Sequence, residues 1–279
     1  MFRKPMVAAV VLLVGLACLA GEELTLKGST TVLPIAQLAA EVFAERFPEV
    51  AVSVQGGGSG VGIAALIDGT CDIADASRAM KPSEWARAVE KGVYPYHWFI
   101  ASDGIAIVVH PQNPLQRLTL AEIKDLYTGR ITNWKELGGP DLKVVTISRD
   151  SASGTYEVFK ELVLSGEEPS APGMLFQPSN AAVAEAVART PGAIGYVGMG
   201  YLNPAIKALA VAEDEAGPYV LPSEEAVISG TYPIARPLFM ITNGFPEGVV
   251  RRFIMFILSD EGQRLVSELG YVPIRSLAG

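Results

Sequence analysis

The chain is poor in the two residue types that most often build metal centres and nucleophilic active sites, with two histidines and two cysteines among 279 residues. His97 and His110 each lie in an apolar stretch, which favours a structural role, and no His-Glu-x-x-His spacing is present. Cys71 is typical of a small buried residue, and after loss of an N-terminal leader it would have no cysteine partner for an intrachain disulfide. We therefore expect no metal, no cofactor and no disulfide framework.

Basic residues are also fewer than acidic ones. The chain has 22 Lys and Arg and 30 Asp and Glu, which gives a net charge of −8. Nucleic-acid binding depends on neutralising phosphates with Lys and Arg, so this balance argues against a nucleic-acid partner. An acidic surface also repels small anions at long range. An anion site in this chain would have to be built from local hydrogen-bond donors.

Long apolar runs are absent beyond the first twenty residues. Residues 1–4 carry two positive charges, residues 5–16 form an uncharged and mostly apolar run, and Cys18 and Ala20 occupy the −3 and −1 positions of a cleavage site. This is the layout of a secretory signal peptide, and the run is shorter than the roughly 20 residues of a spanning helix. We expect residues 1–20 to be removed, which leaves a soluble periplasmic or extracytoplasmic protein with a net charge near −10. An uncleaved anchor and a lipid on Cys18 stay open as alternatives.

Short apolar segments alternate with segments of helical periodicity along the rest of the chain. The segments that indicate buried strands are 24–27, 50–55, 71–76, 104–110, 143–148, 193–198 and 237–242. The segments that indicate helices are 33–47, 61–67, 120–127, 155–164, 181–188 and 249–269. In the first of these, Ile35, Ala39 and Phe43 recur on one face. Strands separated by helices predict an α/β protein with mainly parallel sheets.

Small residues, most of them hydroxyl-bearing, stand at three of the predicted helix starts. They are Ser29, Thr30 and Thr31, then Ser59 and Gly60, then Ser153, Gly154 and Thr155. Glycine allows close backbone approach, and the free N–H groups and positive dipole end of a helix bind anions. One such start is ordinary capping. Three starts that follow parallel strands meet at the edge where open α/β sheets bind ligands, so they predict an anion site.

Charged residues near these starts sharpen the prediction. Arg149 lies four residues before Ser153, where its guanidinium can fork onto two oxygens of a tetrahedral oxyanion. Ser77 and Arg78 follow the third strand and are expected to face the same cleft. A carboxylate in such a site can accept a hydrogen bond from a protonated phosphate and would repel sulfate, which carries no proton. The candidates for this role are Asp72 and Asp75, and either one can instead be a solvated charge.

These motifs, taken in order, resemble the phosphate-binding proteins of the Pst-type ABC importer. The matching segments are Gly28-Ser29-Thr30-Thr31-Val32-Leu33-Pro34, Gly57-Gly58-Ser59-Gly60, Asp72-Ile73-Ala74 through Ser77-Arg78, the Arg-x-x-x-Ser-Gly-Thr pattern from Arg149 to Thr155, and Asn180 with Ala193-Ile194-Gly195-Tyr196. The resemblance runs from about residue 24 to residue 273.

The resemblance implies a type II periplasmic-binding-protein fold, in which two α/β lobes are joined by two crossing strands, here at 104–110 and 233–239. Lobe 1 would hold residues 21–105 plus 236–279, and lobe 2 residues 106–235. The resemblance also implies inorganic phosphate as ligand, the permease subunits of an ABC transporter as partner, a monomeric state and no enzymatic activity. The protein would meet the membrane only through the transporter or a lipid anchor.

The resemblance also assigns roles to individual residues. Thr30, Thr31 and Ser59 would donate hydrogen bonds from lobe 1, and Arg149, Ser153, Gly154 and Thr155 would donate from lobe 2. The chain departs from the family pattern at two places. The best-known members carry an acidic residue near the position of Ser77 and Arg78, which leaves Asp75 as the substitute acceptor, and Ala152 replaces a glycine.

Three other functions are compatible with parts of the sequence. A binder of sulfate, molybdate or tungstate would use the same fold and the same helix starts. A secreted phosphatase-like hydrolase is disfavoured, because residues 57–61 miss the Gly-x-Ser-x-Gly nucleophile pattern at the last position. An exported adhesion or sensor module is a third alternative, since a fold does not determine a function.

Overall fold

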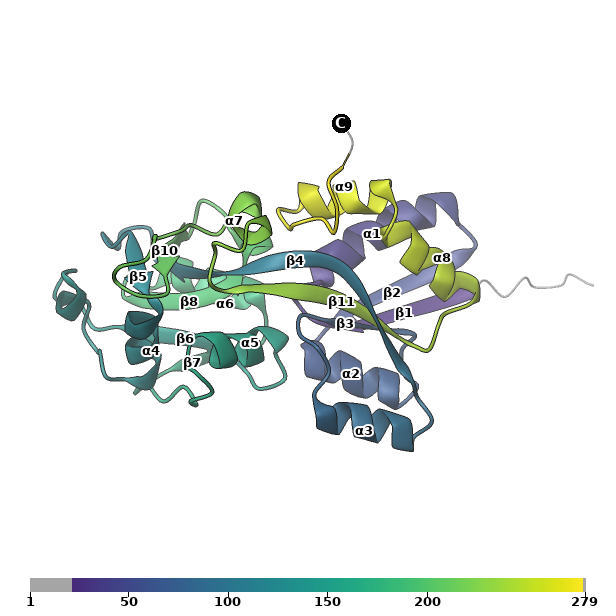
Figure 1. Ribbon diagram of the computed structural model, residues 1–279, viewed down its shortest axis with the longest axis horizontal. Coiled ribbons are helices and arrows are strands. Elements are labelled where there is room, and N and C mark those ends of the chain that lie inside the picture. Colours follow the sequence, from purple (N-terminus) through teal and green to yellow (C-terminus); the bar gives the residue numbers. More distant parts are fainter. Residues whose placement is uncertain (1–21, 278–279) are drawn as a thin grey trace, which may run out of the picture.

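The computed structural model describes residues 22–277 and consists of two lobes joined by two long strands (Figure 1). The α/β class predicted from the sequence is confirmed. The predicted leader at residues 1–20 lies outside the described residues. Between residues 22 and 277, no helix has both the length and the apolar character needed to cross a membrane.

Lobe 1 is built on three parallel strands in the order β2-β1-β3, namely β2 (Val50–Gly56), β1 (Glu22–Gly28) and β3 (Ile73–Ala76). Figure 1 places α1, α8 and α9 on one side of this sheet and α2 and α3 on the other. The helices are α1 (Leu33–Arg46), α2 (Ser59–Ile67), α3 (Pro82–Glu90), α8 (Gly248–Ile257) and α9 (Asp260–Glu268). Parallel strands bring their carboxyl ends to one edge, so the loops after β1, β2 and β3 are neighbours.

Lobe 2 repeats this plan around β6 (Val145–Arg149), which is parallel to both its neighbours, β8 (Ala193–Gly198) and β7 (Leu175–Gln177). Its other elements are β5 (Arg117–Thr119), β9 (Lys207–Ala208), β10 (Ala210–Ala212), α4 (Leu120–Thr128), α5 (Gly154–Leu162), α6 (Asn180–Arg189), α7 (Glu224–Ile228), η1 (Trp134–Leu137) and η2 (Met199–Tyr201). The loop after β6 opens α5, as the loop after β2 opens α2 in lobe 1.

Two antiparallel strands, β4 (Pro95–Val109) and β11 (Ala235–Asn243), connect the lobes (Figure 1). The first part of β4 pairs with β11, and its last residues, from Ile105 on, pair with β8 of lobe 2. The strand predicted at 104–110 therefore begins nine residues earlier than the local pattern indicates. Residues 95–103 mix exposed aromatic side chains with buried and polar ones, and they pair with β11 over this whole length.

The single helix predicted over 249–269 is wrong, because the structure has two helices, α8 and α9, that meet at residues 258–259. Ser259 caps α9, since its Oγ accepts a hydrogen bond from the backbone N–H of Gly262 at 3.3 Å. Both halves keep the apolar period of a helix, so the break does not interrupt the pattern. The short helices α3 and α7 were not predicted; α3 buries only Ala88, and Trp85 and Val89 on the same face stay exposed.

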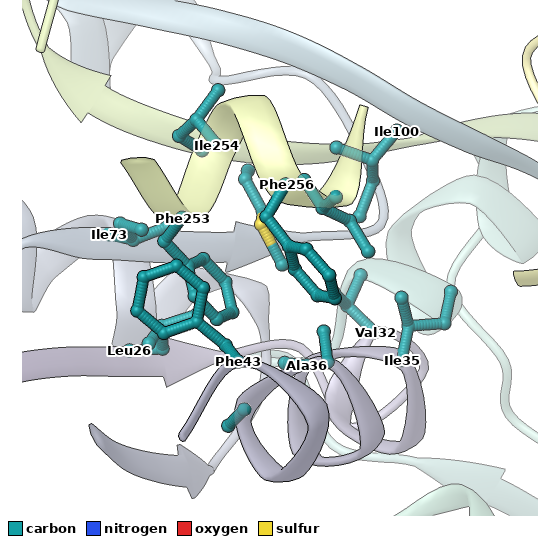
Figure 2. Packing of buried hydrophobic residues seen from close by; sticks show 14 of the residues in the cluster. Leu26, Val32, Ile35, Ala36, Phe43, Ile73, Ile100, Phe253, Ile254 and Phe256 are labelled. Atoms are coloured by element: carbon teal, nitrogen blue, oxygen red, sulfur yellow. The ribbon is translucent and has the colours of Figure 1, made fainter. Parts of the chain in front are cut away.

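The core of lobe 1 is an aromatic cluster between α1 and α8 (Figure 2). The ring of Phe43 lies edge-on to Phe253 and Phe256, with centroid distances of 5.2 Å and 5.8 Å. Leu26 of β1 and Ile73 of β3 belong to the same cluster, so the two helices are packed onto the sheet whose strand ends form the cleft.

Replacing Phe43 by alanine is expected to lower the free energy of unfolding by about 3–5 kcal/mol, because the cavity would lie between three packed elements. Phe245, which is 61% exposed in the same lobe, is the matched control and should cost less than about 1 kcal/mol. Urea unfolding followed by circular dichroism measures both. Similar losses for the two variants would contradict this account of the core.

Candidate anion-binding site

The hydroxyl residues predicted to form the site are all buried at the junction of the two lobes. They are Ser29, Thr30, Thr31, Ser59, Ser77, Ser153 and Thr155. The lobes touch here directly: the backbone N–H of Gly60 donates to the carbonyl of Ala152 at 2.9 Å. Three strand ends of lobe 1 and one of lobe 2 therefore converge on a single buried cluster of hydroxyl groups.

Gly154 allows the two lobes to approach this closely. A Cβ atom at Gly154 would lie 2.3 Å from the Oγ of Ser59 and 2.6 Å from the Oγ of Ser77, both in lobe 1. A side chain at this position would require the two serine side chains or one of the lobes to move. The glycine of the Ser-Gly-Thr motif thus serves lobe closure as well as the exposure of backbone N–H groups.

Several hydroxyl oxygens in the pocket already accept a hydrogen bond from the protein, which leaves their own protons available. The pairs are Asn180 Nδ2 to Thr30 Oγ1 (3.1 Å), Ser77 N to Ser59 Oγ (3.0 Å) and Tyr156 N to Ser153 Oγ (3.2 Å). Each of these oxygens has an N–H donor fixed on one side, so its O–H is free to point away from that donor. Hydroxyls arranged in this way are suited to donate to an anion.

Arg149 is the last residue of β6 and is 1% exposed. Its Nε donates to the carbonyl of Gln177 at 3.1 Å and its Nη2 to the carbonyl of Pro178 at 3.0 Å. These two bonds fix the guanidinium plane. Nη1 is buried and finds no partner within residues 22–277. Burial lowers the pKa of Arg149, yet an arginine keeps its charge in proteins, so one charged donor remains available.

Asp75 lies in β3, two residues before Ser77, and is 1% exposed. Neither of its carboxylate oxygens has a hydrogen-bond partner in the described part of the chain. Burial raises the pKa of Asp75 from 3.8 to about 8. Asp72, the other acidic candidate, is exposed and accepts from the backbone N–H of Thr25 at 2.8 Å. The structure thus buries one of the two carboxylates and leaves the other at the surface.

Unpartnered groups of this kind point to a ligand. Buried polar groups in native proteins almost always have a partner, and leaving one unsatisfied costs about 1–3 kcal/mol, more for a charged group. Here a cationic donor on Arg149 and a carboxyl group on Asp75 are both left without a partner. Each belongs to a segment next to the buried hydroxyls, because Arg149 ends the strand before Ser153 and the carbonyl of Asp75 accepts from the backbone N–H of Ser29. A ligand that satisfies both must carry negative oxygens that accept from Arg149 and an oxygen that can share a proton with the Asp75 carboxyl group.

Two of the predicted site residues have other partners. The Oγ of Ser29 accepts from the backbone N–H of Thr31 at 3.1 Å, so Ser29 shapes the turn after β1. Arg78 makes a two-pronged ion pair with Glu84 of α3, with both N–O distances at 2.7 Å. The charge of Arg78 is therefore largely offset inside lobe 1.

Three residues that the sequence analysis did not assign to the site complete its polar network. Asn180, the first residue of α6, donates to both Thr30 and Thr31. Arg236 of β11 and Asp103 of β4 form a buried ion pair with an N–O distance of 2.8 Å. Asn180 belongs to one of the quoted motifs, which was a usable signal. The isolated charges at 103 and 236 in apolar surroundings were another.

Within residues 22–277, no group of three or more His, Cys, Asp or Glu side chains is arranged to hold a metal ion.

Comparison with known proteins places this architecture in a family. A family model described as a PBP superfamily domain matches residues 19–261. The phosphate-binding protein PstS of Bacillus subtilis is 34% identical over 92% of this chain and 83% of its own length. The chain belongs to the PstS family. A second PstS, from Pseudomonas aeruginosa strain PAO1, is 31% identical over 88% of this chain and 81% of its own length.

Solved structures agree with the PstS assignment. A crystal structure of a substrate-binding protein from Clostridium perfringens, assigned to a phosphate ABC transporter and holding phosphate, is 33% identical with a TM-score of 0.82. It covers 91% of this chain and 100% of its own. A phosphate transport receptor from Vibrio cholerae is 31% identical with a TM-score of 0.71 over 89% of this chain and 99% of its own. The predicted type II periplasmic-binding-protein fold is therefore confirmed.

Proposed function

We propose that this protein captures inorganic phosphate outside the cytoplasm and delivers it to the permease of an ABC importer. The observation that carries the proposal is the pair of unpartnered buried groups, the Arg149 guanidinium and the Asp75 carboxyl, on the strands that lead into the segments with the buried hydroxyls. Phosphate-binding relatives at 31–34% identity over most of the chain support the same ligand.

Phosphate matches this set of groups better than other tetrahedral oxyanions do. Its oxygens accept from Arg149 and from the hydroxyl and amide donors, and at neutral pH it keeps at least one proton that Asp75 can accept when phosphate binds to the ionised form of this carboxyl group. Sulfate has no such proton, so it would face the carboxylate as a second anion. Selectivity therefore comes from one acceptor in a pocket of donors.

We assign the binding roles within the predicted set accordingly. The direct donors are Thr30, Ser59, Gly60, Ser153, Gly154, Thr155 and Arg149, and Asp75 is the acceptor. We assign supporting roles to Ser29, Thr31, Ser77 and Arg78. Ser29 accepts from the backbone N–H of Thr31, Thr31 and Ser77 bond to the donors Thr155 and Ser59, and Arg78 is paired with Glu84. Binding is not followed by reaction: neither histidine is among these residues, and the ring of His97 stacks on Trp85 with centroids 5.9 Å apart.

The proposed function also requires lobe movement and export. We divide the chain at the crossing strands, into residues 21–105 plus 236–279 and residues 106–235, so that β4 and β11 act as the hinge. The signal-peptide layout of residues 1–20 supports release outside the cytoplasm, where a monomer would meet its permease.

Titration calorimetry on the mature chain, stripped of ligand by unfolding and refolding, tests the proposal. We expect one-to-one phosphate binding at micromolar affinity or tighter, about −8 kcal/mol, from a handful of charge-assisted hydrogen bonds. Sulfate and molybdate, titrated separately, should give little heat. Absence of phosphate binding, or tighter binding of molybdate, would keep the family assignment and overturn the proposed ligand.

A further inference from the structure

The ion pair between the two crossing strands is directly connected to the proposed phosphate site. Arg236 of β11 donates from Nε and Nη2 to one oxygen of Asp103 of β4, at 3.0 Å and 2.8 Å, and both side chains are buried. The same Nη2 donates to the Oγ1 of Thr31 at 3.1 Å. Because Asp103 offsets the charge of Arg236, this arginine is placed to orient neighbouring groups rather than to hold an anion.

Asn180 supplies a second fixed donor to Thr31. The backbone N–H of Gly198 donates to the Oδ1 of Asn180 at 3.1 Å, which identifies the other amide atom as nitrogen. That Nδ2 lies 3.1 Å from the Oγ1 of Thr31. Neither an arginine nor an amide NH2 group can accept a hydrogen bond here, so Thr31 accepts from both.

The two hydrogen bonds that the Thr31 oxygen accepts determine the direction of its own proton. A hydroxyl has two acceptor positions and one proton, and both acceptor positions of Thr31 are occupied. Its proton is therefore directed to its third neighbour, the Oγ1 of Thr155, at 3.0 Å across the lobe junction. Thr155 then accepts from Thr31, and its own proton is free for the ligand.

We propose that Arg236 is a positioning residue for phosphate binding: with Asn180 it directs the Thr31 proton to Thr155, so that Thr155 donates to phosphate. The proposal rests on the proposed function. It assigns Thr31 as a relay instead of a direct donor. The residue that fixes the direction of the Thr31 proton, Arg236, lies on one of the two strands that connect the lobes. Without Arg236, the hydrogen bond between Thr31 and Thr155 can reverse its direction, so that Thr155 donates to Thr31. Thr155 would then present an oxygen lone pair to the anion.

A double-mutant cycle tests the proposal. Arg236 is removed together with its partner charge in Asp103→Asn/Arg236→Met, which leaves no unpaired buried charge. The amide oxygen introduced at position 103 can still accept from the backbone N–H of Met199, as Asp103 does at 2.9 Å. We expect this pair variant to weaken phosphate binding about tenfold, and Thr155→Val to weaken it about tenfold or more. The combination with Thr155→Val should be no worse than Thr155→Val alone, within about twofold, because both changes remove the same donor.

Ser153→Ala provides the matched control, since Ser153 begins the same helix and its Oγ is bonded to Tyr156 N and not to the network. On the Ser153→Ala background, the pair variant should still weaken phosphate binding about tenfold. Equal losses of phosphate affinity on the Thr155→Val and Ser153→Ala backgrounds would overturn the proposal. A general structural role of Arg236, or a direct contact with phosphate, would reduce the affinity by the same factor on either background. A wild-type protein that does not bind phosphate would instead overturn the proposed function.

A second variant keeps the test available if the pair variant does not fold. Thr31→Val removes the relay hydroxyl and leaves the ion pair in place. It should weaken binding about tenfold alone, add nothing to Thr155→Val and add its full effect to Ser153→Ala. Additive losses in both combinations would show that Thr31 acts independently of Thr155 and would overturn the relay.

Discussion

Replacing Asp75 by asparagine is expected to reduce the selectivity for phosphate over sulfate at least tenfold. The side-chain amide keeps the shape of the carboxyl group but is uncharged, and its NH2 group donates where the carboxylate accepts. Sulfate then meets a donor instead of a second anion, whereas phosphate loses its proton acceptor. Calorimetric titration of both anions into the variant and the wild type measures the ratio of the two affinities.

Asp72→Asn is the matched control, because Asp72 lies three residues earlier and is exposed. It should leave the ratio of affinities unchanged. An unchanged ratio in Asp75→Asn would place the acceptor at another residue, and a changed ratio in Asp72→Asn would point to the surface charge instead.

Asp75→Asn is also expected to stabilise the ligand-free protein at alkaline pH. Burial raises the pKa of Asp75 to about 8 from an ordinary value of 3.8, so the folded state holds a proton that the unfolded state releases. The stability that this proton provides is complete below pH 3.8 and is lost as the pH rises through about 8. The amide of Asp75→Asn does not titrate and has no such loss. The free energy of unfolding of the variant should therefore exceed that of the wild type by an amount that grows up to about pH 8.

The size of this effect is at most about 6 kcal/mol above the folded-state pKa, from about 1.4 kcal/mol for each unit of pKa shift. Urea unfolding of phosphate-free protein at a series of pH values measures it. A difference between variant and wild type that does not change between pH 4 and pH 9 would contradict the burial of an unpaired carboxyl at this position.

Replacing Arg149 by alanine is expected to weaken phosphate binding at least tenfold. Its Nη1 is a charged and buried donor, and a hydrogen bond to a charged group contributes roughly 1.5–3 kcal/mol, or about ten- to a hundredfold in affinity. Arg149→Lys should lose most of this as well, because a lysine cannot hold the two carbonyls of residues 177 and 178 while presenting a third N–H to the ligand.

Arg130→Ala is the control for a general change in charge, because Arg130 is a surface residue of lobe 2 whose side chain is 54% exposed. It should leave the phosphate affinity within about twofold, in line with the small effects of exposed charges. Thermal melting of each variant checks that the fold is intact. A folded Arg149→Ala protein with wild-type affinity would remove Arg149 from the site.

Features that depend on local chemistry were predictable. Ser153 was placed at a helix start because capping needs only neighbouring residues, and its Oγ does cap α5. Asp75 and Asp72 were both candidates, since a sequence pattern cannot tell which carboxylate of a strand is buried. For Arg78, the ion pair with Glu84 depends on α3, a helix that was not predicted from the sequence.

The sequence by itself determined the α/β class, the small residues that precede three helices and the resemblance to a phosphate-binding family, because these depend on short-range patterns and on motifs in a characteristic order. The tertiary structure alone decided that Asp103 meets Arg236, 133 residues away, and that Thr31 meets Thr155 across the lobes. It also decided that Arg149 and Asp75 keep unpartnered atoms in a buried pocket. Hydrogen bonds between distant segments depend on strand pairing and lobe closure, which bring together residues whose local sequences contain no information about one another.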